Sequence, residues 1–106
     1  MTAEPTPGYV ALMSAVSEEE FMRSVIGIAE ARGWLAYHTH DSRRSQRGFP
    51  DLTLVRGSRL VFAELKTVTG KLSTAQRHWL AALRDTAAEV YVWRPLDMRI
   101  VEETLS

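Results

Sequence analysis

The pattern of apolar and polar residues along the chain predicts two amphipathic helices and four short strands. Apolar residues recur at helical spacing after Ser17 and again after Ser73. Each of these serines stands three residues before a Glu or a Gln, which is the capping-box signature of a helix start. Runs rich in β-branched and aromatic residues separate and follow the helices. We expect one helix from the cap Ser17 to the residue before Gly33, which ends it as the C′ residue, and another from Ser73 to about residue 88. Strands are expected over residues 34–39, 51–56, 59–66 and 89–94.

The order of these elements is αβββαβ, which predicts one α/β domain with a mixed central sheet flanked by helices. Gly57 and Ser58 fit the two-residue loop of a type II′ turn, so the second and third strands should form a hairpin. The second helix then crosses back to the last strand. Residues 1–16 are expected to be a tail with at most a short helix, and residues 98–106 a C-terminal helix or tail.

The composition limits the cellular compartments and the kinds of cross-link expected for this domain. The chain has 106 residues, the size of one domain, and it contains no cysteine. Disulfides and thiolate metal sites are therefore excluded, and a reducing compartment is favoured. The sequence shows neither an apolar run long enough to cross a membrane nor a secretory signal. We therefore expect a cytoplasmic location and no membrane partner.

The charge of the chain is unevenly distributed although its net value is zero. Residues 40–77 contain eight basic and three acidic residues, so this segment carries +5 and the remainder −5. A positive segment of this kind suits a phosphate backbone. Ordinary solvated surface is the alternative explanation, and charge alone does not choose between them.

The hairpin register predicts a cluster of charged side chains at the end of the hairpin far from its turn. Counting outward from the turn places Asp51 opposite Glu64, and Lys66 lies on the same face as Glu64. Directly opposed carboxylates repel, so one must be protonated, or both must be paired with a cation or a metal ion. A Mg²⁺ site fits this pattern. A salt-bridge cluster at the sheet edge fits it equally well.

These residues also carry a family resemblance. Pro50-Asp51 followed by Glu64-Leu65-Lys66 resembles the PD-(D/E)xK nuclease motif. With the preceding Arg-Gly-Phe and the later residues Gly70, Leu72, Gln76 and Trp79, the pattern resembles the virus-type replication-repair nuclease family, VRR-NUC. The resemblance covers residues 17–97, which would form the nuclease domain with a restriction-endonuclease-like fold. The chain is close in length to the minimal domain, as in the stand-alone members of phages and bacteria.

The resemblance implies roles for individual residues. Asp51, Glu64 and the carbonyl of Leu65 would bind Mg²⁺ or Mn²⁺, and Lys66 would orient or activate the attacking water and stabilise the charge of the transition state. Gln76 matches the family's glutamine at the start of the second helix, although a capping role alone also explains it. Glu18 matches an acidic residue of the first helix and extends its buried stripe. A dipole-stabilising residue at the helix rim is the alternative for Glu18.

The remaining polar residues are candidates for DNA contacts. The set expected to touch DNA comprises His40, Arg43, Arg44, Arg47, Lys71 and Arg77, with a solvated loop as the alternative for the arginines. His38 and His40 would share a strand face, but the sequence offers no third ligand at a spacing that suits zinc. The three tryptophans, Trp34, Trp79 and Trp93, lie on apolar faces and are expected in the core rather than against bases.

The expected function is a Mg²⁺- or Mn²⁺-dependent DNA endonuclease acting on branched or structured DNA. Stand-alone members of the family resemble four-way-junction resolvases, which implies a homodimer, because cutting two strands needs two sites. The N-terminal tail and residues 98–106 are both candidates for the dimer contact. A non-catalytic DNA-binding module and a sequence-specific restriction-like nuclease remain the alternatives.

Overall fold

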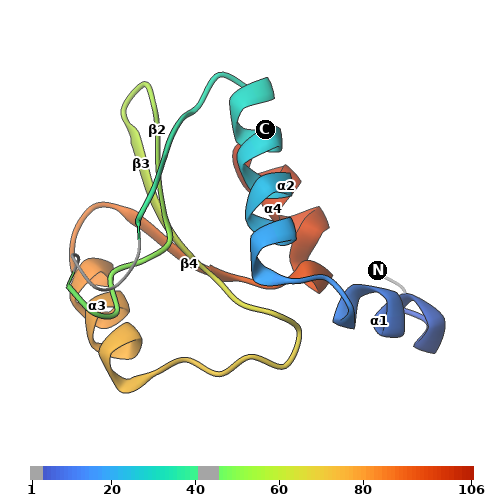
Figure 1. Ribbon diagram of the computed structural model, residues 1–106. Coiled ribbons are helices and arrows are strands. Elements are labelled where there is room, and N and C mark those ends of the chain that lie inside the picture. The colour runs from blue at the N-terminus through green and yellow to red at the C-terminus, as the bar shows by residue number, and fades with distance from the viewer. Residues whose placement is uncertain (1–3, 41–45) are drawn as a thin grey trace.

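The computed structural model describes residues 4–40 and 46–106 and is built around a four-stranded sheet (Figure 1). The strands lie in the order β1-β2-β3-β4. The elements are α1 (Pro7–Ser14), α2 (Glu18–Ala31), β1 (Leu35–His38), β2 (Leu52–Arg56), β3 (Arg59–Leu65), α3 (Thr74–Arg84), β4 (Glu89–Trp93), a 3₁₀ turn (Pro95–Asp97) and α4 (Met98–Leu105).

The sheet is mixed, as the sequence predicted. β1 pairs antiparallel with β2 and β2 with β3, whereas β3 and β4 run parallel. The hairpin register places Arg56 opposite Arg59 and Leu52 opposite Ala63. Gly57 has a φ of 60° and Ser58 has no positive φ, as a type II′ turn requires. The αβββαβ order and the hairpin register are therefore confirmed.

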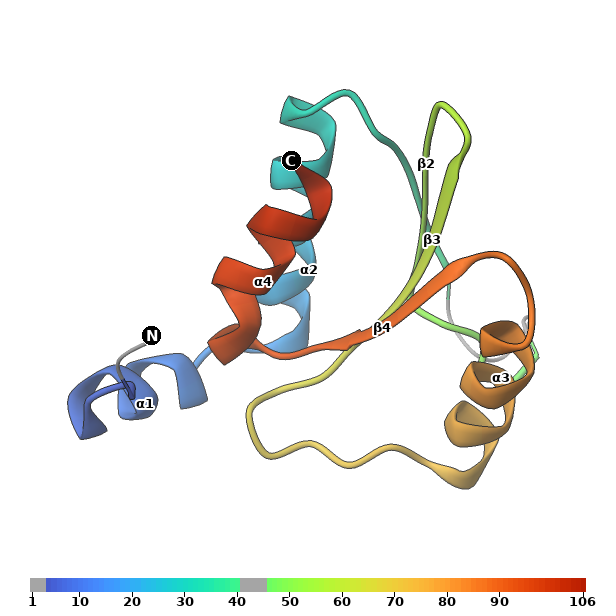
Figure 2. The same cartoon turned by 180° about the vertical axis from the view of Figure 1, so that it is seen from behind.

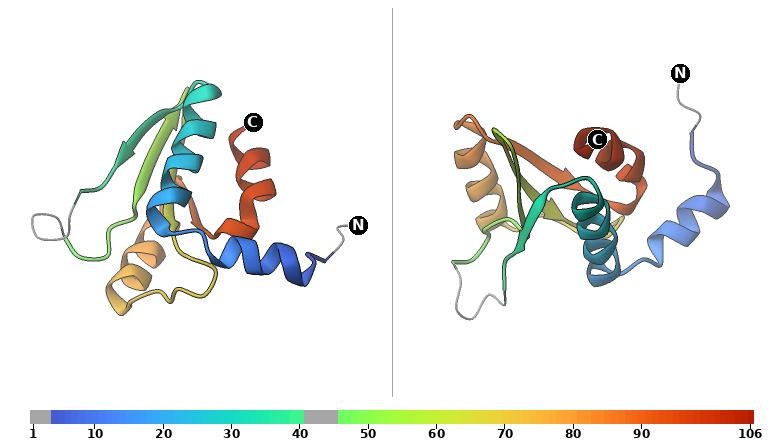
Figure 3. Two further views of the ribbon diagram at one scale, coloured as in Figure 1. Left: turned by 45° about the vertical axis from the view of Figure 1, so that its right-hand side comes forward. Right: turned by 90° about the horizontal axis from the view of Figure 1, so that it is seen from above.

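Helices cover both faces of the sheet (Figures 2 and 3). α2 and α4 lie together on one face, where Phe21, Val25 and Val101 pack against Leu54 and Val61 of the strands in the main core. α3 lies on the other face, and α1 extends away from the body of the domain. The alternation of side chains along each strand decides which residues enter which layer.

The face that carries α3 is only partly covered. Near α3, Phe49 packs edge-to-face against Trp79 and Phe62, with ring centroids 5.1 and 5.8 Å apart. Farther along the same face, toward the hairpin turn, Leu35 and Tyr37 of β1 are 75% and 59% exposed. The sheet face that α3 covers at one end therefore exposes apolar side chains to solvent at its other end.

Helix α3 ends earlier than the sequence predicted. α3 stops at Arg84 instead of continuing to residue 88, because Asp85 caps it and Thr86 turns the chain back on the helix end. The Thr86 hydroxyl donates a hydrogen bond of 2.6 Å to the Leu83 carbonyl and accepts one from the Ala88 N–H. A threonine side chain that hydrogen-bonds to nearby backbone groups competes with helical hydrogen bonds, and here it ends the helix.

The two terminal segments differ in how they join the domain. Residues 98–105 form α4, whose Val101 and Leu105 are fully buried, and the Trp34 indole N–H donates to the Leu105 carbonyl at 2.9 Å. α1 buries none of its residues, and it leaves Leu12 64% exposed. The C-terminal helix is thus part of the core, whereas α1 is an appendage.

None of the helices in the described ranges combines the length and the apolar character that crossing a membrane requires.

Candidate active site

Asp51 and Glu64 meet at the end of the hairpin far from its turn, as the register predicted. Asp51 comes directly before β2, and its Oδ2 accepts a hydrogen bond of 2.8 Å from the Leu65 N–H on β3. Glu64 is the penultimate residue of β3 and is only 1% exposed. The two strands therefore hold both carboxylates at a fixed place, one of them removed from solvent.

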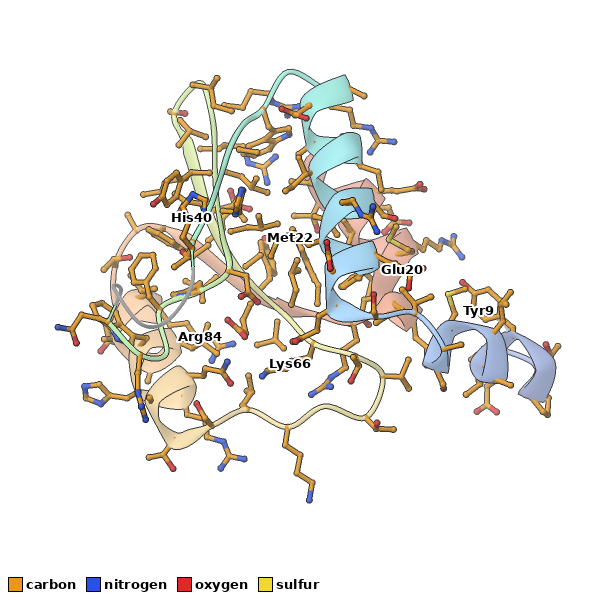
Figure 4. The ribbon with its side chains drawn as sticks, viewed as in Figure 1. Tyr9, Glu20, Met22, His40, Lys66 and Arg84 are labelled. Carbon is orange, nitrogen blue, oxygen red and sulfur yellow. The ribbon has the colours of Figure 1, made fainter. Side chains whose placement is uncertain are left out.

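Lys66 follows β3 directly and completes the cluster. Its Nζ lies 3.8 Å from Oε2 of Glu64, and its backbone N–H continues the parallel ladder by donating to the Trp93 carbonyl. Its side chain is 13% exposed. Figure 4 shows Lys66 at the end of β3, in the region between α2 and α3. The ammonium group thus lies beside the Glu64 carboxylate on a largely buried side chain.

Gln76 on the first turn of α3 serves the helix and the site at once. Its Oε1 accepts the Ser73 N–H at 2.8 Å, which closes the capping box. Its Nε2 donates to Oε2 of Glu64 at 2.8 Å. One side chain therefore closes the capping box and contacts Glu64.

The environment of Glu64 disfavours its charge. Burial raises the pKa of Glu64 from its ordinary value of 4.5 to about 8; the neighbouring charge of Asp51 adds to the rise and Lys66 opposes it. Its Oε1 is buried and has no hydrogen-bond partner among the described residues. A buried acceptor without a donor is costly. Both features would be relieved by a cation placed between the two carboxylates.

The donor set fits a hard divalent cation with an incomplete protein shell. No group of three His, Asp or Glu side chains in residues 4–40 and 46–106 lies close enough to hold a metal ion. Two carboxylates with backbone, solvent and phosphate oxygens is the arrangement that Mg²⁺ commonly takes. The rings of His38 and His40 lie 4.6 Å apart, but the described residues supply no third ligand that would make this pair a zinc site.

Glu18 occupies a different position from the one its sequence pattern predicted. It is the first residue of α2 and is exposed instead of extending the buried stripe. Its charge nevertheless contributes to the raised pKa of Glu64, which places it near the cluster. At the first turn of a helix a carboxylate can face solvent and still remain close to a site beside that turn.

The segment that leads to Asp51 is fastened to both neighbours. Gly48 has a φ of 89°, and a Cβ at this position would lie 2.4 Å from the backbone carbon of Ala75 on α3. On the other side, the Thr39 N–H donates to the Asp51 carbonyl at 2.8 Å and its hydroxyl to the Pro50 carbonyl at 2.8 Å. Asp51 is thus positioned by contacts to β1 and to α3.

Arg94 supports the loop after Lys66, a role that the sequence did not indicate. Its Nη1 donates to the carbonyls of Thr67 and Gly70 at 2.7 and 2.6 Å. Gly70 is held in turn by its N–H, which donates to the Thr67 hydroxyl. No local pattern could have predicted this contact, because it joins residues 24 and 27 positions apart through backbone oxygens.

The basic residues proposed for DNA contacts fall into two groups. His40, Arg47, Lys71 and Arg77 are exposed. Arg43 and Arg44 lie outside the described residues. Two other arginines of the positive segment, Arg56 and Arg59, instead stack on Trp34 with their guanidinium carbons 4.6 and 4.9 Å from the ring centroid. Both arginines thus make contacts within the domain. The positive segment of residues 40–77 therefore has fewer charges available to phosphate than its composition suggests.

The fold and site define an α/β protein with a nuclease-like arrangement, and the comparisons with known proteins agree. A family model described as the VRR-NUC domain matches residues 2–95. A solved structure of a VRR_NUC domain has a TM-score of 0.68 and 24% identity, covering 86% of this chain and 96% of its own. A VRR_NUC domain protein has a TM-score of 0.67 and 16% identity, covering 86% and 91%. A search of curated proteins found no match.

The chain therefore belongs to the VRR-NUC family, which is a nuclease family. The family match confirms the resemblance read from the sequence, and the solved structures confirm the fold, since identities this low carry no further argument. DNA is accordingly the substrate class that this fold serves.

Proposed function

We propose that this protein is a metal-dependent DNA endonuclease. The observation that carries the proposal is the carboxylate pair formed by the half-buried Asp51 and the buried Glu64, with Lys66 Nζ 3.8 Å from the Glu64 carboxylate. A repulsive pair of this kind weakens the fold in the absence of a cation. Its presence in a nuclease fold is explained by the chemistry it can support.

Asp51, Glu64 and the Leu65 carbonyl would hold Mg²⁺ or Mn²⁺. When bound, such a cation polarises the phosphate and lowers the pKa of the attacking water. The ammonium group of Lys66 lies beside the Glu64 carboxylate, where it would stabilise the negative charge that develops on the phosphate oxygens in the transition state. Gln76 fixes the orientation of the Glu64 carboxylate through its amide.

We further propose branched or structured DNA as the substrate and a homodimer as the active form. The described part of one chain carries one such carboxylate pair, and cutting both strands of a four-way junction needs two. Of the two terminal segments considered for the contact, α4 is occupied in the core. α1 leaves Tyr9 and Leu12 exposed, so it is the segment that a second copy would cover. Light scattering after gel filtration tests the dimer, and Leu12→Asp should return it to a monomer.

The test of the activity is cleavage of labelled four-way junction, flap, single-stranded and plain duplex DNA. Each substrate is incubated with Mg²⁺, with Mn²⁺ or with EDTA. The variants are Glu64→Gln, which removes a charge from the pair, and Lys66→Met, which keeps the length of the side chain without its ammonium group. Glu30→Gln is the matched control, because Glu30 is an exposed residue of α2 outside the site.

We expect metal-dependent cleavage by the wild type and by Glu30→Gln, and its loss in both site variants. Preference for the junction or flap would support the structured substrate, whereas equal cutting of all four DNAs would contradict it. If the wild type binds DNA but cuts none with either metal, the enzyme proposal fails and a DNA-binding module takes its place.

A further inference from the structure

A small aromatic pocket lies on the sheet face that α3 only partly covers. It has a volume of about 240 Å³ and is lined, among the described residues, by Tyr37, Thr39, Gln46, Phe49 and Trp79. Three of these five side chains are aromatic, and Tyr37 is 59% exposed. Of the three tryptophans expected in the core, Trp34 and Trp93 are buried there, whereas Trp79 is half-buried at this pocket.

The pocket is joined to the candidate active site through three of its lining residues. Thr39 donates from its backbone N–H to the carbonyl of Asp51 itself. Phe49 stands two residues before Asp51, and Trp79 lies one helical turn after Gln76 on α3. A group of the substrate that entered the pocket would therefore lie beside the phosphate presented to the carboxylates.

The size of the pocket suits one flat ring system. Pockets that take drug-sized ligands measure about 300–1,000 Å³, so 240 Å³ suits a smaller group. Phe49 is held edge-on by Trp79 and by Phe62, which keeps the aromatic wall rigid. Thr39 and Gln46 add polar atoms to the lining. A mostly aromatic lining with a few polar groups matches the two faces and the edge of a nucleobase.

The charge around the pocket also favours a nucleic-acid group. His40 follows Thr39 and Arg47 follows Gln46, and both are exposed. Basic residues next in sequence to the lining residues suit the phosphates on either side of an inserted base. In a continuous duplex the bases are stacked on one another, so only an unpaired or splayed base is free to enter a protein pocket.

We propose that this pocket binds one unpaired base of the DNA substrate, next to the phosphate that is cut. The proposal rests on the proposed nuclease function and adds a reason for preferring branched over plain duplex DNA. Stacking of a base on aromatic side chains tolerates any base sequence. The pocket would therefore select for the structure of the DNA and not for its sequence.

The experiment uses DNA that carries 2-aminopurine, a fluorescent base whose emission falls when it stacks on an aromatic ring. One duplex holds it unpaired and a second holds it paired with thymine, each with a dye at the far end for binding by anisotropy. The protein is Glu64→Gln in EDTA, so that cleavage does not interfere. Tyr37→Ser and Trp79→Leu are added to this background. Leu35→Ser is the matched control, because Leu35 is an exposed residue of the same strand and face but not of the pocket.

We expect emission to fall for the unpaired base alone, and the fall to disappear in Tyr37→Ser and Trp79→Leu but not in Leu35→Ser. Loss of one stacked base should weaken binding of the bulged DNA by about 5- to 150-fold, without change for the paired duplex. Tyr37→Ser still tests the pocket if Trp79→Leu unfolds, because Tyr37 is largely exposed and its substitution should leave the fold intact.

The outcomes separate this proposal from the proposed function. Equal emission and affinity in Tyr37→Ser and Leu35→Ser would overturn the pocket while leaving the nuclease untouched. A wild type that cuts no DNA but shows the emission change would keep the pocket and remove the enzyme. Failure to bind either DNA would contradict both.

Discussion

The two capping boxes of this protein share one motif and differ in what they do. At α2, Glu20 is exposed, and its side chain bonds only to Ser17 within the described residues. At α3, Gln76 uses Oε1 for the Ser73 N–H and still has its Nε2 free to donate to Glu64. The first box starts a helix, and the second starts a helix and orients a site residue.

The difference lies in the second terminal atom of the capping side chain, which the capping box does not use. Either Glu or Gln closes a capping box with one oxygen. The second atom of a Glu is another acceptor, whereas that of a Gln is a donor. Next to a buried carboxylate only the donor is useful, so the identity of the capping residue carries functional information that the motif alone does not.

The largest expected effect, on the free energy of unfolding, comes from changing Glu64, which accepts the hydrogen bond from Gln76. Burial and Asp51 raise the pKa of Glu64 to about 8, so between about pH 5 and pH 8 the folded protein holds a proton that the unfolded chain has released. The stability of the metal-free protein should therefore fall as the pH rises through this range. Glu64→Gln removes the titrating group. It should raise the free energy of unfolding at pH 8 by about 1–3 kcal/mol, with less gain at pH 5.

Urea denaturation in EDTA at the two pH values measures this effect. Glu20→Gln is the control from the other capping box and should leave the pH dependence as it is in the wild type. A wild type whose stability is the same at pH 5 and pH 8 would show that Glu64 is not strained by its surroundings.

Exchanging the capping residues tests the comparison directly. Gln76→Glu keeps an oxygen for the Ser73 N–H but turns a second carboxylate oxygen toward Glu64. The helix content seen by circular dichroism should not change. Cleavage should fall about 10- to 100-fold, the usual cost of losing a residue that orients a metal ligand. Glu20→Gln should cut DNA at the wild-type rate, and equal rates for both variants would remove the distinction between the boxes.

The smallest effect is expected from the serines that begin the two boxes. Ser17→Ala and Ser73→Ala should each lower the free energy of unfolding by about 1 kcal/mol, because each removes a side-chain acceptor for a helix N–H. Only Ser73→Ala should also slow cleavage, and by less than Gln76→Glu, since it loosens the turn that carries Gln76. Matching cleavage rates in the two variants would mean that the cap does not hold the amide in place.

The hairpin and its charged end could be predicted from the sequence because short-range rules decide both. Gly57 and Ser58 select the turn, and the period of two along a strand then places Asp51 against Glu64. In the hairpin a pattern a few residues long determines the geometry. The capping box marked the start of α3 in the same way, but only the family resemblance connected Gln76 with the site.

Other features escaped prediction because they depend on contacts between distant parts of the chain. Arg56 and Arg59 look like free cations in the sequence but stack on Trp34, which the sheet brings to them. Glu18 follows the spacing of the buried stripe, yet the first turn of α2 leaves it exposed. Trp79 lies on an apolar helix face, and only the partial cover of the sheet shows that this face opens on a pocket.

The two fastenings of Asp51 lie at residues that do not belong to the charged cluster. Thr39 ties the end of β1 to the Pro50 and Asp51 carbonyls, and Gly48 leaves no room for a side chain against Ala75. A substitution at either fastening would therefore displace the carboxylate while every charged residue of the cluster stays in place. For protein engineering, Thr39 and Gly48 belong with the residues to be kept fixed, although neither of them carries a charge.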